Sequence, residues 1–224
     1  MFRKYLLLVV LLLIFTAVIL TNLSFTKFLI GWDNLLPELN LGLNIKRAIF
    51  STWQEYQGLG LLAGNGHAAE LPRLIFIYLL SFIAPINLIR QIYVFTMLLT
   101  GALGVYFLIK TVFNKNSPVA FIGSLFYLLN LMTVQTFYVP FEPMITHYGF
   151  LPWLILSLIY FLENNTKKAL FFFITINILA IPQGQVPTVF LVYLFVFAII
   201  LVSYNLREKR KELVNKSLKA IFLT

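Results

Sequence analysis

A succession of long apolar runs limits what this chain can fold into. The first run, Tyr5 to Leu23, is interrupted only by two threonines and an asparagine, and hydrophobic residues make up 60% of the chain. A soluble domain of 224 residues cannot bury that much apolar surface, so most of the chain is expected to lie in lipid. In hydrocarbon the backbone must satisfy its own hydrogen bonds, which leaves helices or closed barrels. Because the runs show no in–out alternation, we predict an all-α, polytopic membrane protein.

The net charge of +9 and the absence of cysteine narrow the function classes. An excess of basic residues can indicate a nucleic-acid partner, but the enrichment of Lys and Arg on the cytoplasmic side of membrane proteins explains this excess more simply. We therefore expect no nucleic-acid partner. Without cysteine the chain has neither a disulfide framework nor a thiolate metal site.

We predict one domain over residues 1–224, with about six crossings of the cell membrane and both ends in the cytoplasm. Residues 5–23 form the first span, long enough to cross about 30 Å of hydrocarbon. Because the run is longer than a usual signal-peptide core and no A-x-A cleavage site follows it, we interpret it as an uncleaved anchor. The other predicted segments are a large outer loop at 24–90, five further spans within 91–204 (near 91–112, 118–134, 150–162, 170–181 and 187–204), and a cytoplasmic segment at 205–224 that leads into a further span of a longer protein.

The segment Leu71 to Leu88 decides the topology, because it is apolar but interrupted by Pro85 and Asn87. If it does not cross, most of the 17 Lys and Arg residues lie inside, and Lys27, Lys46, Arg47, Arg73 and Arg90 remain outside. If it crosses, the basic run 207–211 moves outside. The positive-inside rule therefore favours a re-entrant or surface helix.

The outer loop is predicted to contain short helices at the membrane surface. Pro37 occupies a typical first helical position. The mixture of charged and apolar residues over 45–56 suits a helix lying in the interface. The glycines at 58, 60, 64 and 66 then predict a flexible turn region.

Asp33 and Glu38, in the stretch GWDNLLPE, are the leading candidates for chemistry. A carboxylate near the interface is partly desolvated, which raises its pKa and makes it a better base. The alternatives are a solvated loop acid at Asp33 and an acid that complements the helix dipole at Glu38.

Two further pairs of an acid and a histidine lie in predicted outer loops. His67 and Glu70 are three residues apart, a spacing that puts them on one helix face. Glu142 and His147 lie in the second outer loop and could face the same cleft as Asp33. Ordinary surface-loop positions are the alternative for both pairs.

Amides and arginines complete the candidate set. Gln183 and Gln185 lie in IPQGQVP, where two prolines predict irregular backbone that must be covered by protein or water. Amides suit sugar hydroxyls, and a tight connection is the alternative. The outer basic residues, Arg47, Arg73 and Arg90 among them, could contact lipid phosphates or a pyrophosphate leaving group, with interfacial snorkelling as the alternative.

The whole pattern resembles the GT-C superfamily of polytopic glycosyltransferases, in particular bacterial arabinofuranosyltransferase-like and YfhO-like membrane proteins. The residues that carry the resemblance are GWDNLLPE, WQEYQGLG with Trp53, GNGHAAELPR, the LPW at 151–153 and IPQGQ. It implies a polyprenyl-phosphate sugar donor, a glycan, lipid or protein acceptor, and in many members a divalent metal such as Mg²⁺ or Mn²⁺.

We therefore predict a membrane glycosyltransferase, or its N-terminal module, with Asp33 as the catalytic base. The residues assigned to substrate binding are Glu38, Arg47, Trp53, His67, Glu70, Arg73, Gln183 and Gln185. The residues assigned to metal binding are Asp33, Glu142 and His147. The alternatives are a non-catalytic transporter or flippase for lipid-linked glycans, and a structural subunit of an envelope complex. Because the predicted spans carry almost no charge at their centres, ion-coupled transport is disfavoured.

Overall fold

The computed structural model describes residues 2–31, 36–50, 53–54, 59–62, 64–113, 117–207 and 221. Over these residues the chain is a bundle of helices with one very short hairpin, so the all-α prediction is confirmed. The elements of the first half are α1 (Phe2–Asn22), η1 (Pro37–Asn40), α2 (Leu41–Phe50), β1 (Trp53–Gln54), β2 (Leu61–Leu62), α3 (Gly64–Ala69) and α4 (Leu71–Leu80). Those of the second half are α5 (Ile86–Val112), α6 (Ser117–Leu129), α7 (Leu131–Tyr138), α8 (Glu142–Asn164), α9 (Lys167–Ala180), η2 (Ile181–Gln185) and α10 (Pro187–Arg207).

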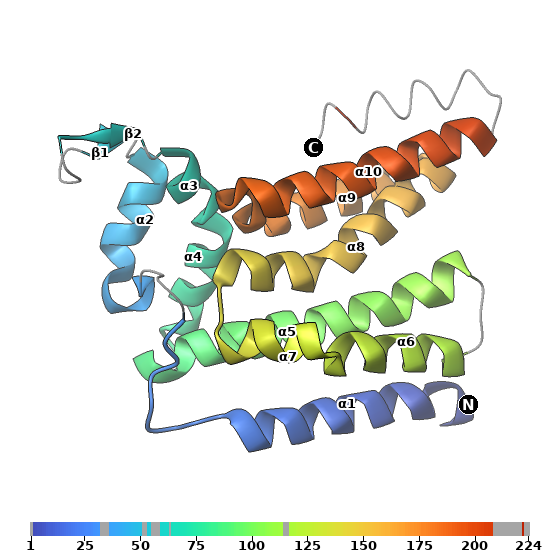
Figure 1. The fold of residues 1–224 in the computed structure, drawn as a ribbon, viewed down its shortest axis with the longest axis horizontal. Coiled ribbons are helices and arrows are strands. Elements are labelled where there is room, and N and C mark those ends of the chain that lie inside the picture. The colour runs from blue at the N-terminus through green and yellow to red at the C-terminus, as the bar shows by residue number, and fades with distance from the viewer. Residues whose placement is uncertain are drawn as a thin grey trace.

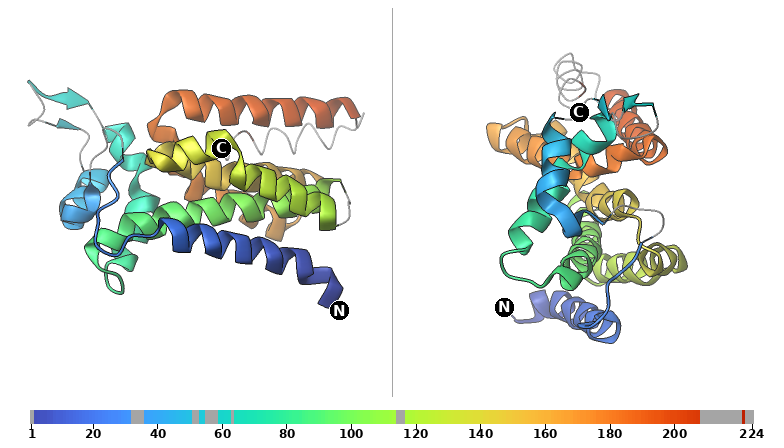
Figure 2. Two further views of the ribbon diagram at one scale, coloured as in Figure 1. Left: turned by 60° about the horizontal axis from the view of Figure 1, so that its bottom comes forward. Right: turned by 90° about the vertical axis from the view of Figure 1, so that its left-hand side faces the viewer.

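The helices form two groups with different orientations (Figure 1). Helices α1, α5, α6, α8, α9 and α10 run along the long axis, whereas α2, α3 and α4 gather at one end. We call this the α4 end; α1 ends there, and α5, α8 and α10 begin there. The N-terminus lies at the opposite end, as Figure 1 and the left-hand view of Figure 2 show. The arrangement places the long apolar helices side by side and puts the described parts of the more polar segment 24–85 at one end of them.

Among the described residues, three helices are long and apolar enough to cross a membrane: α5, α8 and the part of α10 from Pro187 to Leu206. The pair α6–α7, bent by 43°, would make a fourth. Large apolar side chains are exposed along the bundle, for example Leu20, Phe126 and Phe195, which fits a lipid surround.

Apolar clusters hold the bundle together in three places. One joins α8, α9 and α10 around Phe173, and one joins α1, α5 and α6 around Leu98. The third packs α2 and α4 on α5 around Ile89. Helices α5 and α8 are also tied by the indole of Trp153, whose Nε1 donates to the Thr100 carbonyl at 2.8 Å. This bond satisfies the indole N–H group of α8 with a carbonyl of a different helix.

Several predicted boundaries in the outer loop are wrong. The interfacial helix expected over 45–56 ends at Phe50, and Trp53 pairs with Leu62 in the hairpin. Aromatic residues favour strands, and Gly60 lies against the Trp53 indole with a φ of +103° that other residues rarely adopt. Gly64 and Gly66, expected in a flexible turn, lie in α3, where packing on α2 and η2 compensates for the weak helix propensity of glycine.

The largest error concerns α8, which begins at Glu142 and not near Phe150. Glu142 and His147 are therefore helical and do not lie in a loop. The acid in the first turn complements the helix dipole, and Pro143 suits a first-turn position. Likewise α5 begins at Ile86, directly after Pro85, so the apolar segment Leu71–Leu88 is divided between α4, a turn and the first residues of α5.

Candidate functional site

Five charged side chains meet at the α4 end and form what we call the charged cluster: Glu38, Glu70, Arg73, Arg90 and Glu142. All five are buried, with Glu142 only 1% exposed and Arg90 4% exposed. Arg90 Nη2 lies 2.5 Å from Glu142 Oε1, and Arg90 Nε lies 3.4 Å from Glu38 Oε1. Arg73 Nε donates to Glu70 Oε2 at 2.5 Å, and Arg73 Nη1 lies 3.5 Å from Glu142 Oε1. Glu142 therefore links the two arginines.

Each member comes from the beginning of a helix or from the turn before one. Glu38 lies in the first turn of η1, Arg90 in the first turns of α5, and Glu142 at the start of α8. Glu70 immediately precedes α4, and its spacing of three residues from Arg73 puts the two side chains on one face. The N-terminal end of a helix disfavours a cation, so Arg90 requires the two carboxylates beside it.

Burial controls the electrostatics of the cluster. Burial raises the pKa of the Glu70 carboxyl, and Arg73 partly opposes this effect. Burial alone would lower the pKa of Arg73, but the carboxylates of Glu70 and Glu142 outweigh it and raise that pKa above its usual value. Buried charges persist only when they are paired, so the cluster must form as a unit.

Two neutral residues of the long helices complete the surroundings of the cluster. The hydroxyl groups of Tyr93 on α5 and Thr146 on α8 are hydrogen-bonded to each other. The guanidinium of Arg73 lies over the Tyr93 ring, 5.9 Å from its centroid. Thr146 also donates to the Glu142 carbonyl at 2.7 Å. These contacts fix α5 and α8 relative to each other at the level of the cluster.

The chain on both sides of residues 32–35 is held at Arg90. Before this segment, the Leu29 carbonyl accepts a hydrogen bond from Arg90 Nη1 at 3.3 Å, and after it, Glu38 forms the ion pair with Arg90. Gly31 packs so closely on the Pro140 carbonyl that a side chain would collide with it. Asp33 itself lies outside the described residues.

A clamp at Gln91 fixes the chain just after α1. Its Nε2 donates to the carbonyls of Ser24 at 2.7 Å and Lys27 at 3.0 Å, and its Oε1 accepts from Ser24 N. Gln91 and Arg90 are consecutive residues, so the start of α5 contacts the chain at Ser24, Lys27 and Leu29 and again at Glu38.

The turn IPQGQ brings a second group of predicted residues together. Gln183 is 2% exposed, and its Oε1 lies 2.6 Å from His147 Nδ1. The turn packs on α3, α4 and α8, and Gln185 is exposed with its Cγ near Gly66 of α3. Half-buried His67, also on α3, has a pKa lowered by burial and by the nearby charge of Arg47.

The structure does not bring the predicted site residues into one group. Glu38, Glu70, Arg73 and Glu142 meet in the cluster, and His147 meets Gln183. Trp53 is 53% exposed on the hairpin, outside the cluster contacts described above. Of the predicted metal ligands, Glu142 faces two guanidinium groups, and in the described part of the chain no three His, Asp or Glu side chains gather as a metal site. The metal assignment stays a prediction.

Sequence reasoning underestimated Arg90 and missed Gln91, Tyr93 and Thr146. The sequence groups Arg90 with outer basic residues that could contact lipid phosphates or a leaving group, or snorkel at the interface, whereas the structure buries it between carboxylates. The available signal was the adjacent pair Arg90-Gln91 at the start of a long apolar run, since polar side chains there need partners inside the protein.

Comparison of the chain with protein-family models, with curated proteins and with solved structures gave no significant match.

Proposed function

We propose that this chain is a membrane glycosyltransferase of the GT-C type, or its N-terminal module, with six crossings and both ends in the cytoplasm. The long-axis helices α1, α5, α6–α7, α8, α9 and α10 supply the crossings, and α2, α3 and α4 lie at the outer surface. The arrangement of α4 across the end of the bundle (Figure 1) supports the interpretation in which Leu71–Leu88 does not cross. The positive-inside rule supports the same orientation.

One observation carries the proposal. A buried cluster of charges lies at the end that would face outwards, and its Arg90 contacts the chain on both sides of the segment that contains Asp33. Five buried charges do not stabilise a protein that only has to span lipid, because replacing such groups by apolar ones is often neutral or stabilising. The presence of these charges supports a functional role for the loop that they hold.

In the proposed reaction, the acceptor hydroxyl attacks the anomeric carbon of a polyprenyl-phosphate-linked sugar. The new bond joins the acceptor oxygen to that carbon, and the bond from the carbon to the phosphate oxygen breaks. Asp33 takes the hydroxyl proton as general base, and the lipid phosphate leaves with the bonding electrons. Arg90, Glu38 and Glu142 position the Asp33 segment, and Gln183 and Gln185 supply amides suited to sugar hydroxyls.

The test is sugar transfer in membrane vesicles that contain the protein, with radiolabelled polyprenyl-phosphate arabinose, mannose and glucose as donors. We expect transfer with at least one donor, and Asp33→Asn should reduce it by roughly 10²-fold or more because the general base is lost. The matched control is Glu163→Gln, an exposed acid at the opposite end, which should keep full activity. Full activity of Asp33→Asn would contradict the assignment.

The complete mutual pairing of the cluster supports a second candidate function, a structural subunit of an envelope complex. Each of the five charges has an ion-pair partner within the cluster. Under this alternative none of the donors is turned over, and substitutions at the α4 end change the recovery of partner subunits without affecting any transfer rate.

A further inference from the structure

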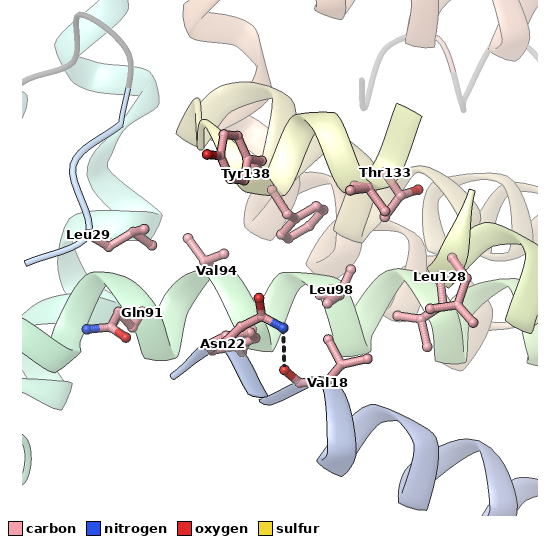
Figure 3. A pocket seen from close by; sticks show the side chains of 13 residues that line it. Val18, Asn22, Leu29, Gln91, Val94, Leu98, Leu128, Thr133 and Tyr138 are labelled. Carbon is pink, nitrogen blue, oxygen red and sulfur yellow. Dashed lines mark hydrogen bonds between the residues drawn. The ribbon is translucent and has the colours of Figure 1, made fainter. Parts of the chain in front are cut away.

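A cavity of about 450 Å³ lies on the face of α5 that carries Gln91, Val94 and Leu98. Figure 3 shows α1 with Val18 and Asn22 on one side of it and α7 with Thr133 and Tyr138 on the other. Along α5 it extends from Gln91 to Leu98, which is about 10 Å at 1.5 Å per residue. The cavity therefore follows the helices inwards from the α4 end. Its volume is within the range of small-molecule sites.

The bend between α6 and α7 builds this cavity. Asn130 Oδ1 accepts from Thr133 N at 2.9 Å, and Asn130 Nδ2 donates to the carbonyls of Phe126 and Tyr127 at 3.1 Å. Thr133 Oγ1 donates to the same Tyr127 carbonyl at 2.7 Å. Because these hydrogen bonds satisfy the backbone at the bend, α7 is held away from α1 at a defined angle. The hydrogen bonds of the bend thus define the shape of the cavity.

Of the four polar side chains that line the cavity, three already have hydrogen-bond partners within the protein, and the fourth, Tyr138, is 82% exposed. Gln91 bonds Ser24 and Lys27, Asn22 Nδ2 donates to the Val18 carbonyl at 2.8 Å, and Thr133 bonds Tyr127. The remaining wall is aliphatic and aromatic, including Val94, Phe95 and Phe137. A polar occupant would lose its water without gaining partners here, whereas an apolar one completes the dispersion contacts of the wall.

We propose that this cavity binds one acyl chain of a membrane phospholipid. The neighbouring cation Arg90 is buried and engaged with Glu38, Glu142 and the Leu29 carbonyl. The wall therefore favours a hydrocarbon chain over a particular headgroup. The most abundant lipid chain occupies such a site by mass action, and phospholipid chains far outnumber polyprenyl chains in a bilayer. This inference rests on the membrane setting proposed above and not on the transfer chemistry.

The test uses the protein in nanodiscs that contain a phospholipid with a diazirine in the middle of one acyl chain. After irradiation, mass spectrometry should find adducts on the α5 segment 94–98, although Val94 and Leu98 are only 3% and 4% exposed. Leu154 and Leu158 of α8, which are buried but do not line the cavity, serve as the internal reference. We expect several-fold more adduct on 94–98 than on 154–158. Equal labelling would overturn the proposal.

A matched pair of variants tests whether the cavity itself is responsible. Val134→Trp adds bulk at the cavity, where Val134 is 54% exposed, and should reduce the adducts on 94–98 by about fivefold or more. Val192→Trp on α10, at 51% exposure, should leave them unchanged. Leu129→Trp approaches the same cavity from α6 and replaces Val134→Trp if that variant does not fold. Unchanged adducts in the folded cavity variant would contradict the assignment.

A competition experiment separates the two sources of hydrocarbon. Polyprenyl phosphate added at a few mole percent should leave the adducts on 94–98 in place. Displacement at that level would assign the cavity to the carrier lipid and overturn the phospholipid proposal. Loss of transfer in Asp33→Asn, with adducts retained, separates this site from the proposed catalytic one.

Discussion

At the α4 end of the bundle five charged side chains are buried and paired with one another, whereas at the opposite end Glu163, Lys167 and Lys168 are exposed. The opposite end connects α8 to α9 through a tight turn, in which Asn165 adopts a left-handed conformation. There, Glu163 accepts a hydrogen bond from the Tyr204 hydroxyl at 2.7 Å. The same residue types thus have different energetic roles, because exposed charges are solvated while buried ones depend on their partners.

Removal of one acid from each end should separate these roles most clearly. Glu142→Ala leaves Arg73 and Arg90 without their shared carboxylate, so we expect a loss of about 3–5 kcal/mol in the free energy of unfolding. Glu163→Ala at the opposite end should change it by about 0.5 kcal/mol or less. The measurement is thermal or denaturant unfolding of both variants in the same detergent. Similar small losses would show that the cluster is not a cooperative unit.

A second comparison uses two glycines, Gly31 and Gly42, that differ in the space around them. Gly31→Ala forces a methyl group against the Pro140 carbonyl beside Arg90, so we expect a destabilisation of about 1–3 kcal/mol. Gly42 lies in α2 with open space around its Cα, and Gly42→Ala should stabilise the protein by about 0.5–1 kcal/mol through helix propensity. Opposite shifts in the unfolding midpoint are expected. Two shifts of the same sign would contradict the close approach at Gly31.

The smallest expected effect concerns His67. Its pKa is lowered from 6.5, so the unfolded chain takes up this proton more readily than the folded protein. The contribution of His67 to the free energy of unfolding is therefore fully present above pH 6.5, and it is lost as the pH falls below that value. Glu70, whose pKa is raised from 4.5, has the opposite effect: its contribution to the free energy of unfolding falls as the pH rises above 4.5. The difference between wild type and His67→Gln, measured at about pH 7.5 and pH 5.5, isolates the histidine. Equal pH dependence of the two proteins would contradict this interpretation.

Much of the fold could be predicted because long apolar runs determine helices directly. The start of α10 at Pro187 and the break around Pro85 followed from composition and proline chemistry. The start of α8 could not be predicted, because Glu142 and His147 are polar residues typical of a loop unless their partners on other elements are known.

The site could be predicted only in its residue types. Glu38, Glu70, Arg73 and Glu142 were all identified as candidates, but for contacts with substrate, phosphate or metal and not with one another. Their convergence depends on tertiary packing between η1, α4, α5 and α8, which sequence spacing does not encode. Only the pair Glu70–Arg73 has a spacing that indicates contact.

The central claim is that the α4 end faces outwards and the opposite end faces the cytoplasm, and cysteine labelling tests it most directly. Because the chain has no cysteine, single substitutions can be introduced at exposed Leu59 and uncrowded Gly184 at the α4 end, and at exposed Lys168 at the opposite end. We expect a membrane-impermeant maleimide to label intact cells at positions 59 and 184, and at 168 only after permeabilisation. Labelling of 168 in intact cells, or protection of 59 and 184, would contradict the account.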